Sequence, residues 1–181
     1  MILFAFLILP VFLVWFCFYL KTTRIVPAIL FGAVEAVLLC LFLTLFVFSH
    51  RIIPFSFFKN LVHLSLTQTV LPVIISFLFY VLISKDNRQI KTEAFLPLET
   101  TFFSVYLPYT ILITSRENYS GFLLFFKPVL FLIMILLCAF SLKKIFENFV
   151  SKKTFAAILF IFVFIVALFI PPVAETIWLI K

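Results

Sequence analysis

Long apolar runs that contain almost no charged residue constrain this chain more than any other feature of its sequence. The first run, ILFAFLILPVFLVWFCFYL, begins at residue 2 and contains no charged side chain. A helix needs about 20 mainly apolar residues to cross the roughly 30 Å of hydrocarbon in a bilayer. Such runs recur along the whole chain, which is 66% hydrophobic and 12% charged and has a mean hydropathy of +1.33. The sequence therefore predicts an all-α integral membrane protein surrounded by the lipid bilayer.

Six segments have the length and composition of membrane spans. Five of them are easily recognised as spans. The segment from Leu96 to Ser115 fits the composition of a span less well, because it contains Glu99, two prolines and several hydroxyl side chains. The first run lacks a preceding positive segment and a small-residue cleavage site, so we expect it to remain as a helix. No connection is long enough to fold alone, which predicts a single polytopic membrane domain over residues 1–181. The predicted spans are 2–20, 25–49, 61–84, 96–115, 122–142 and 154–174.

The distribution of lysine and arginine predicts the orientation of these spans, because cytoplasmic connections usually carry the excess of both residues. With six crossings and both termini on the extracytoplasmic side, nine basic residues fall inside, four fall outside and Lys127 lies within a span. If 96–115 did not cross, the best split would be seven to six. The charge bias therefore favours six crossings. The nine inner residues are Lys21, Arg24, Lys85, Arg88, Lys91, Lys143, Lys144, Lys152 and Lys153.

The same bias explains the formal net charge of +7 without a nucleic-acid partner. The 29 phenylalanines, and lysines that outnumber arginines by ten to four, are typical of an AT-rich bacterial coding sequence. We therefore expect a multi-pass protein of the bacterial cytoplasmic membrane.

Glu35 is a carboxylate inside the apolar stretch FGAVEAVLLCLF of the second span. Ala28, Gly32 and Ala36 recur every four residues in the same span and form a stripe of small side chains on which another helix can pack closely. At 100° per residue, Glu35 lies near this stripe, so we expect it to face a helix and not lipid. There it is either protonated and hydrogen-bonded or paired with a cation, and a packing role competes with a functional one.

Two further spans carry stripes of polar side chains. Because hydroxyl groups in hydrocarbon need partners, we expect both stripes to face the bundle interior and each other. Interhelical hydrogen bonding is the favoured interpretation, and a polar cavity for a solute is the alternative. The stripe of the third span contains Ser65, Thr69, Ser76 and Tyr80, and that of the fourth contains Glu99, Tyr106, Thr110 and Thr114.

The last two spans raise two separate expectations. Lys127 lies about six residues from the outer end of its span, which favours an ammonium group that reaches the interface along its own stem. The alternative is an ion pair with Glu35, whose depth differs by about 7 Å. Pro171 and Pro172 are predicted to end or kink the last helix, so that VAETIWLIK lies at the interface.

The sequence offers little for catalysis. The two histidines form no HExxH motif, one aspartate excludes an aspartyl dyad, and two glycines exclude phosphate loops and nucleophile elbows. The three cysteines are odd in number and form no CxxC pair, so neither a disulfide framework nor a thiolate metal site is indicated. We expect no enzyme, no metal site and no cofactor.

Two functions are consistent with these features. The preferred one is a non-catalytic membrane subunit of a larger envelope or transport complex, which packs through the small-residue stripe and has other membrane or membrane-associated subunits as partners. The alternative is a transport subunit that binds a small solute or vitamin at a polar intramembrane site. Six spans in about 180 residues are also the size of the substrate-binding subunits of energy-coupling-factor vitamin transporters, an analogy of size that carries no motif.

Overall fold

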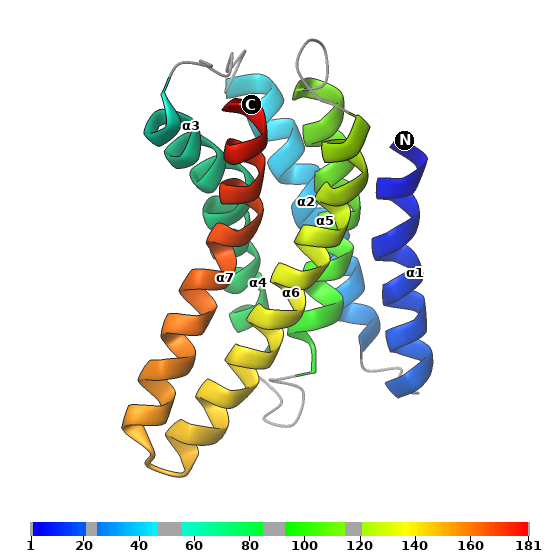
Figure 1. Ribbon diagram of the computed structural model, residues 1–181. Helices are drawn as coiled ribbons and strands as arrows, with labels where there is room; N and C mark the ends of the chain where they lie inside the picture. Colours follow the sequence, from blue (N-terminus) through cyan, green and yellow to red (C-terminus); the bar gives the residue numbers. More distant parts are fainter. Residues whose placement is uncertain (1, 21–24, 47–55, 85–92, 115–120, 181) are drawn as a thin grey trace.

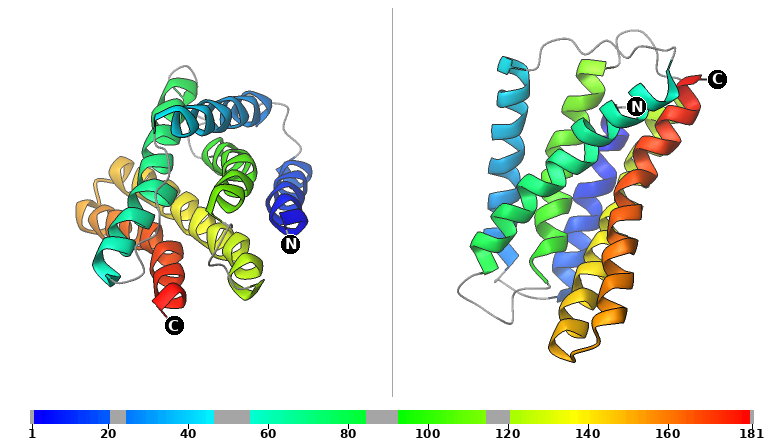
Figure 2. Two further views of the ribbon diagram at one scale, coloured as in Figure 1. Left: turned by 90° about the horizontal axis from the view of Figure 1, so that it is seen from above. Right: turned by 90° about the vertical axis from the view of Figure 1, so that its left-hand side faces the viewer.

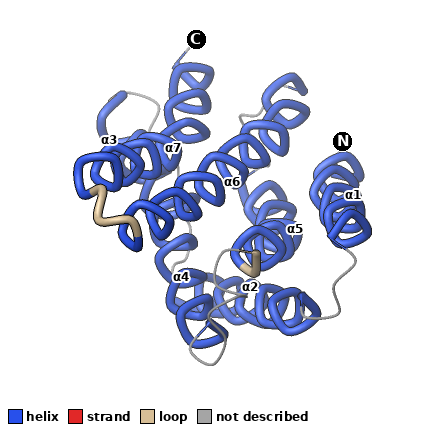
Figure 3. Tube along the Cα trace, turned by 90° about the horizontal axis from the view of Figure 1, so that it is seen from below, coloured by secondary structure: helices blue, strands red, loops and turns tan. Residues whose placement is uncertain are grey.

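The described residues of the computed structural model form a bundle of helices without a strand (Figure 3). The structure describes residues 2–20, 25–46, 56–84, 93–114 and 121–180. The prediction of an all-α protein is confirmed for this part of the chain. The elements are α1 (Ile2–Leu20), α2 (Val26–Phe46), α3 (Phe57–Leu64), the π-helical segment η2 (Ser65–Val70), α4 (Leu71–Ser84), α5 (Phe95–Thr114), α6 (Gly121–Val150) and α7 (Thr154–Ile180).

Four of the described helices are long and apolar enough to cross a membrane. They also expose large apolar side chains on their outer faces, such as Leu82 at 67% and Phe162 at 63%. Soluble proteins rarely expose contiguous apolar surface of this extent, because it would contact water. The fold therefore indicates a membrane protein. The four helices are Val26–Leu45, Phe57–Leu82, Phe125–Val150 and Thr154–Trp178.

Helix α5 lies at the centre of the bundle and contacts α1, α2, α4 and α6 (Figure 2). Its sequence is the weakest of the six predicted spans because of Glu99 and its hydroxyl residues. In the centre these polar groups lie among other helices and not in lipid, where they could not be satisfied. Phe102, Phe103 and Leu107 of α5 are fully buried and form the middle of the core.

A long oblique helix is formed by α3, η2 and α4, which follow one another without a break. It begins at Phe57, earlier than the predicted residue 61, and its middle six residues have π-helical hydrogen bonding. Its first half contacts α7, whereas its second half contacts α2 and α5. Figure 2 shows that α2 and this helix diverge from their lower ends upward. The oblique course thus links two sides of the bundle.

The last two helices, α6 and α7, form a hairpin that packs along most of its length (Figure 1). Pro171 and Pro172 were predicted to end or kink the last helix, and the first alternative, an end near residue 174, is wrong because α7 continues to Ile180. Both prolines are buried, as are Glu175 and Thr176 beyond them. Packing on both sides of the prolines offsets the backbone hydrogen bonds that proline cannot make. The end of α7 is therefore part of the core.

Candidate functional site

The stripe of small residues on α2 faces α5 of the same chain. Ala28 and Ala36 are fully buried, and Gly32 lies between them. A Cβ atom on Gly32 would lie 2.5 Å from the carbonyl oxygen of Leu98 and 3.3 Å from the backbone nitrogen of Phe102. Glycine therefore allows the two helix backbones to approach at this point. The contact brings the middle of α2, including Glu35, against the first half of α5.

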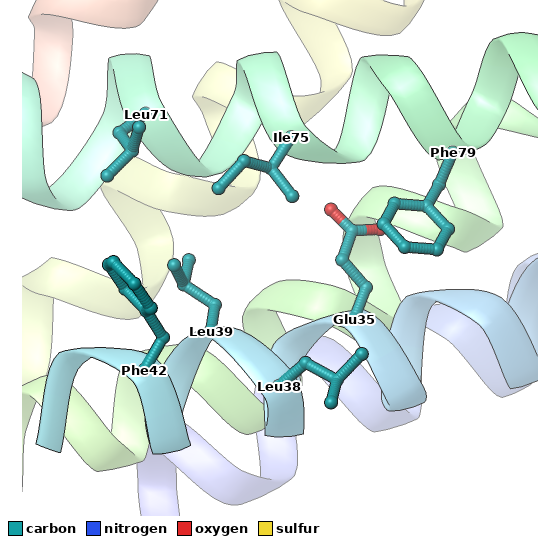
Figure 4. Close-up of a pocket in the computed structure, with 7 residues that line it drawn as sticks. All are labelled: Glu35, Leu38, Leu39, Phe42, Leu71, Ile75 and Phe79. Carbon is teal, nitrogen blue, oxygen red and sulfur yellow. The ribbon is translucent and has the colours of Figure 1, made fainter. Parts of the chain in front are cut away.

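Glu35 is buried at the junction of α2 and α4, with 1% of its surface exposed. Neither of its carboxyl oxygens has a hydrogen-bond partner among the described residues. Figure 4 shows the carboxyl group directed across the gap toward Ile75 and Phe79 of α4. A cavity of about 270 Å³ begins here, and we call it the α2–α4 wedge. Its lining residues are Glu35, Leu38, Leu39, Phe42, Leu71, Ile75 and Phe79.

A second buried carboxyl group, Glu99 of α5, accepts a hydrogen bond from the hydroxyl group of Ser76 on α4. Its other oxygen, Oε2, has no hydrogen-bond partner in the described part of the chain. Glu35 and Glu99 are close enough for their charges to interact. Neither forms an ion pair within the described residues. The bundle interior thus holds two neighbouring acids to which no described residue supplies a counter-charge.

The two predicted polar stripes contact each other at one point, and a second bond joins the stripe of α5 to the backbone of the oblique helix. The contact is the bond between Ser76 and Glu99, and the second bond joins the Tyr106 hydroxyl group to the carbonyl oxygen of Thr67 at 2.5 Å. The remaining stripe residues of the oblique helix, Ser65, Thr69 and Tyr80, are buried. In the fourth predicted span Thr110 is half-buried, and the side chain of Thr114 lies outside the described part.

Lys127 of α6 is buried and paired with Glu175 of α7. Its Nζ atom lies 3.0 Å from Glu175 Oε2 and donates to Oε1 at 3.2 Å, and both side chains are 2% exposed. The prediction that this ammonium group reaches the interface is therefore wrong. The alternative pairing with Glu35 is not formed either. Because α7 continues through its prolines, it carries Glu175 to the side chain of Lys127 and supplies a nearer partner.

Two members of this buried cluster were missed from the sequence, Glu175 and Gln68. The Gln68 Nε2 atom lies 3.4 Å from Glu175 Oε1 and donates to it, which connects η2 with α7. Glu175 is the only acid of α7. A predicted helix that continued past Pro172 would have included Glu175 and indicated it as a partner for Lys127. Gln68 gave no such signal, because its orientation depends on the π-helical geometry of η2.

No group of three or more potential metal ligands occurs in the part of the chain that the structure describes. The two acids Glu35 and Glu99 offer carboxyl oxygens alone, and the cluster around Lys127 is already neutralised by Glu175. Of these groups, Glu35 is the acid that faces a cavity.

No family model matches this chain, and neither a curated protein nor a solved structure matches it.

Proposed function

We propose that this protein is a non-catalytic multi-pass membrane protein that binds a small cationic solute at Glu35 as a component of membrane transport. One observation carries the proposal: Glu35, a buried acid without a partner among the described residues, faces a cavity at the middle of an apolar helix. Burying an unpaired charge costs free energy. We therefore expect an acid at such a place to serve a function that offsets this cost. Ionisable residues within membrane spans commonly mark substrate and ion pathways.

A purely structural role as a subunit of a larger envelope or transport complex takes second place. In the sequence, the stripe of Ala28, Gly32 and Ala36 favours this role, because it offers a surface on which a partner helix could pack. That stripe packs on α5 of the same chain. The stripe therefore gives no reason to expect another subunit there, whereas the cavity at Glu35 gives a reason to expect a solute.

The proposal includes six crossings with both termini on the extracytoplasmic side of a bacterial cytoplasmic membrane. The described helices alternate in direction, and the start of α1 and the end of α7 lie at the same end of the bundle (Figure 1). This arrangement supports the assignment of nine basic residues to one side and four to the other. Glu35 is the tenth of the 21 residues of α2, so it would lie near the middle of the bilayer.

The test is a thermal-unfolding screen of the purified protein in detergent with sodium, potassium, ammonium and a series of alkylammonium ions. We expect at least one of these cations to raise the Tm of the wild type, and Glu35→Gln to abolish that rise. Glu93→Gln is the matched control, because it makes the same chemical change at an exposed residue. A screen in which no cation stabilises the protein, or in which Glu35→Gln responds like wild type, would contradict the proposal.

A further inference from the structure

The α2–α4 wedge opens through the side of the bundle. Three of its lining side chains belong to the outer surface, since Leu38 is 54% exposed, Phe42 50% and Leu71 38%. Large apolar side chains are also exposed on the outer faces of both helices, for example Val34 on α2 and Leu78 on α4, which are 53% and 60% exposed. In a membrane, a surface of this kind contacts lipid chains. A ligand would therefore enter the wedge from the bilayer.

The lining restricts the chemistry of that ligand. Glu35 provides the only polar side chain of the seven lining residues, and the other six are aliphatic or aromatic. An inorganic cation that sheds its water requires several oxygen ligands, as the six to eight around calcium illustrate, and the wedge offers two carboxyl oxygens. An ammonium group on an apolar body needs fewer partners. Phe79 lies beside the Glu35 carboxyl group, where its ring face could attract the same cation (Figure 4).

The volume restricts the size of the ligand. The wedge measures about 270 Å³. A cavity of roughly 150 Å³ holds a benzene molecule, and sites for drug-sized ligands begin near 300 Å³. The wedge therefore suits one aromatic ring or a short alkyl chain with a single charged group.

We propose that the α2–α4 wedge is a binding site for small apolar amines in their protonated form, which enter from the lipid bilayer and pair with Glu35. This inference rests on the proposed function and specifies its ligand class. The amine nitrogen lies at the narrow end of the wedge, next to Glu35 and Phe79. The apolar body lies between Leu38 and Phe42 of α2 and Leu71 and Ile75 of α4.

The test measures binding of hexylammonium to the protein in lipid nanodiscs, with methylammonium, hexanol and sodium as comparison probes. Each apparent affinity is corrected for partition of the probe into protein-free nanodiscs. We expect hexylammonium to bind more tightly than the other three. Glu35→Gln should weaken its binding about tenfold or more, as the loss of a charge-assisted hydrogen bond implies.

A second pair of variants tests the place of binding without touching the charge. Ile75→Phe adds bulk to a lining residue and should abolish hexylammonium binding, whereas Ile74→Phe makes the same change on the adjacent exposed position and should leave it unchanged. Near-equal binding of hexanol and hexylammonium would show that the wedge takes any apolar chain, lipid included, and would overturn the inference. Retained binding in Ile75→Phe would overturn it as well.

The two proposals fail in different ways. If sodium or methylammonium binds in a manner that depends on Glu35 while hexylammonium does not, the inference is wrong and the proposed function stands. If none of the cations binds, both are wrong.

Discussion

At the scale of single residues, the buried charges of this protein fall into two groups with different consequences. Lys127 and Glu175 neutralise each other, and Gln68 adds a hydrogen bond to the same carboxylate. Glu35 and Glu99 have no basic partner among the described residues. The first group fixes three segments of the chain against one another, since it joins η2, α6 and α7. The second leaves acid groups in the interior that a ligand can neutralise.

The first prediction concerns the buried pair. Lys127→Met and Glu175→Met should each lower the free energy of unfolding by about 3–5 kcal/mol, because each leaves a buried charge without its partner. The double variant should recover much of that loss, since it removes both charges. Equilibrium unfolding in mixed detergent micelles measures all three.

Lys144→Met is the matched control for this pair, because it breaks the exposed ion pair with Glu147 on the same helix. It should leave the free energy of unfolding unchanged within error, since exposed pairs contribute little. Single variants of Lys127 or Glu175 that behave like Lys144→Met would contradict a structural role of the buried pair.

Residue patterns in the sequence were sufficient to locate Glu35 and the hydroxyl stripes, but not the partner of Lys127. The position of Glu35 beside small residues follows from helical spacing within one span. The partner of Lys127 depends on which helices are neighbours and on whether α7 continues beyond Pro172. The local preference of proline to interrupt a helix was outweighed by the packing of buried residues on both sides.

At the scale of elements, hydropathy predicted where the helices lie along the sequence, but it did not predict which helix would occupy the centre of the bundle. The least apolar predicted span became the central helix α5, because its polar residues are satisfied or enclosed by neighbouring helices. The π-helical segment η2 has no signature in the sequence that spacing could reveal. It changes which side chains face α7 and places Gln68 against Glu175.

The second prediction concerns the contact of α2 with α5. Gly32→Ala should lower the free energy of unfolding by about 1–3 kcal/mol, because the added Cβ atom would meet the backbone of Leu98, which cannot rotate away as a side chain could. Gly32→Leu should have a larger effect. Val37→Leu, which adds a methylene at a position of α2 that is 48% exposed, is the control and should be neutral. If Gly32→Ala is as stable as wild type, α2 and α5 are not closely packed at Leu98.

At the scale of the whole molecule, the positions of the buried groups follow from the oblique helix. Its first half lies against α7, where Gln68 meets the ion pair, and its second half lies against α2 and α5, where Ser76 meets Glu99. The divergence of α2 from this helix leaves the wedge at Glu35 open on one side. One helix thus contributes both to the neutralised cluster and to the cavity that Glu35 faces.

The third prediction concerns the number of crossings. Lys59 on α3 and Lys153 after α6 are both exposed, and three long helical segments separate them: α3–η2–α4, α5 and α6. If all three cross, the two residues lie on opposite sides of the membrane. In a variant without Cys17, Cys40 and Cys138, Lys59→Cys should react with a membrane-impermeant maleimide on intact cells, and Lys153→Cys only after the membrane is opened. Each variant is the control for the other, because the same label and background are used. Labelling of both from the same side would mean that one of the three segments does not cross. The first candidate would be α5, because it is the least apolar of the three.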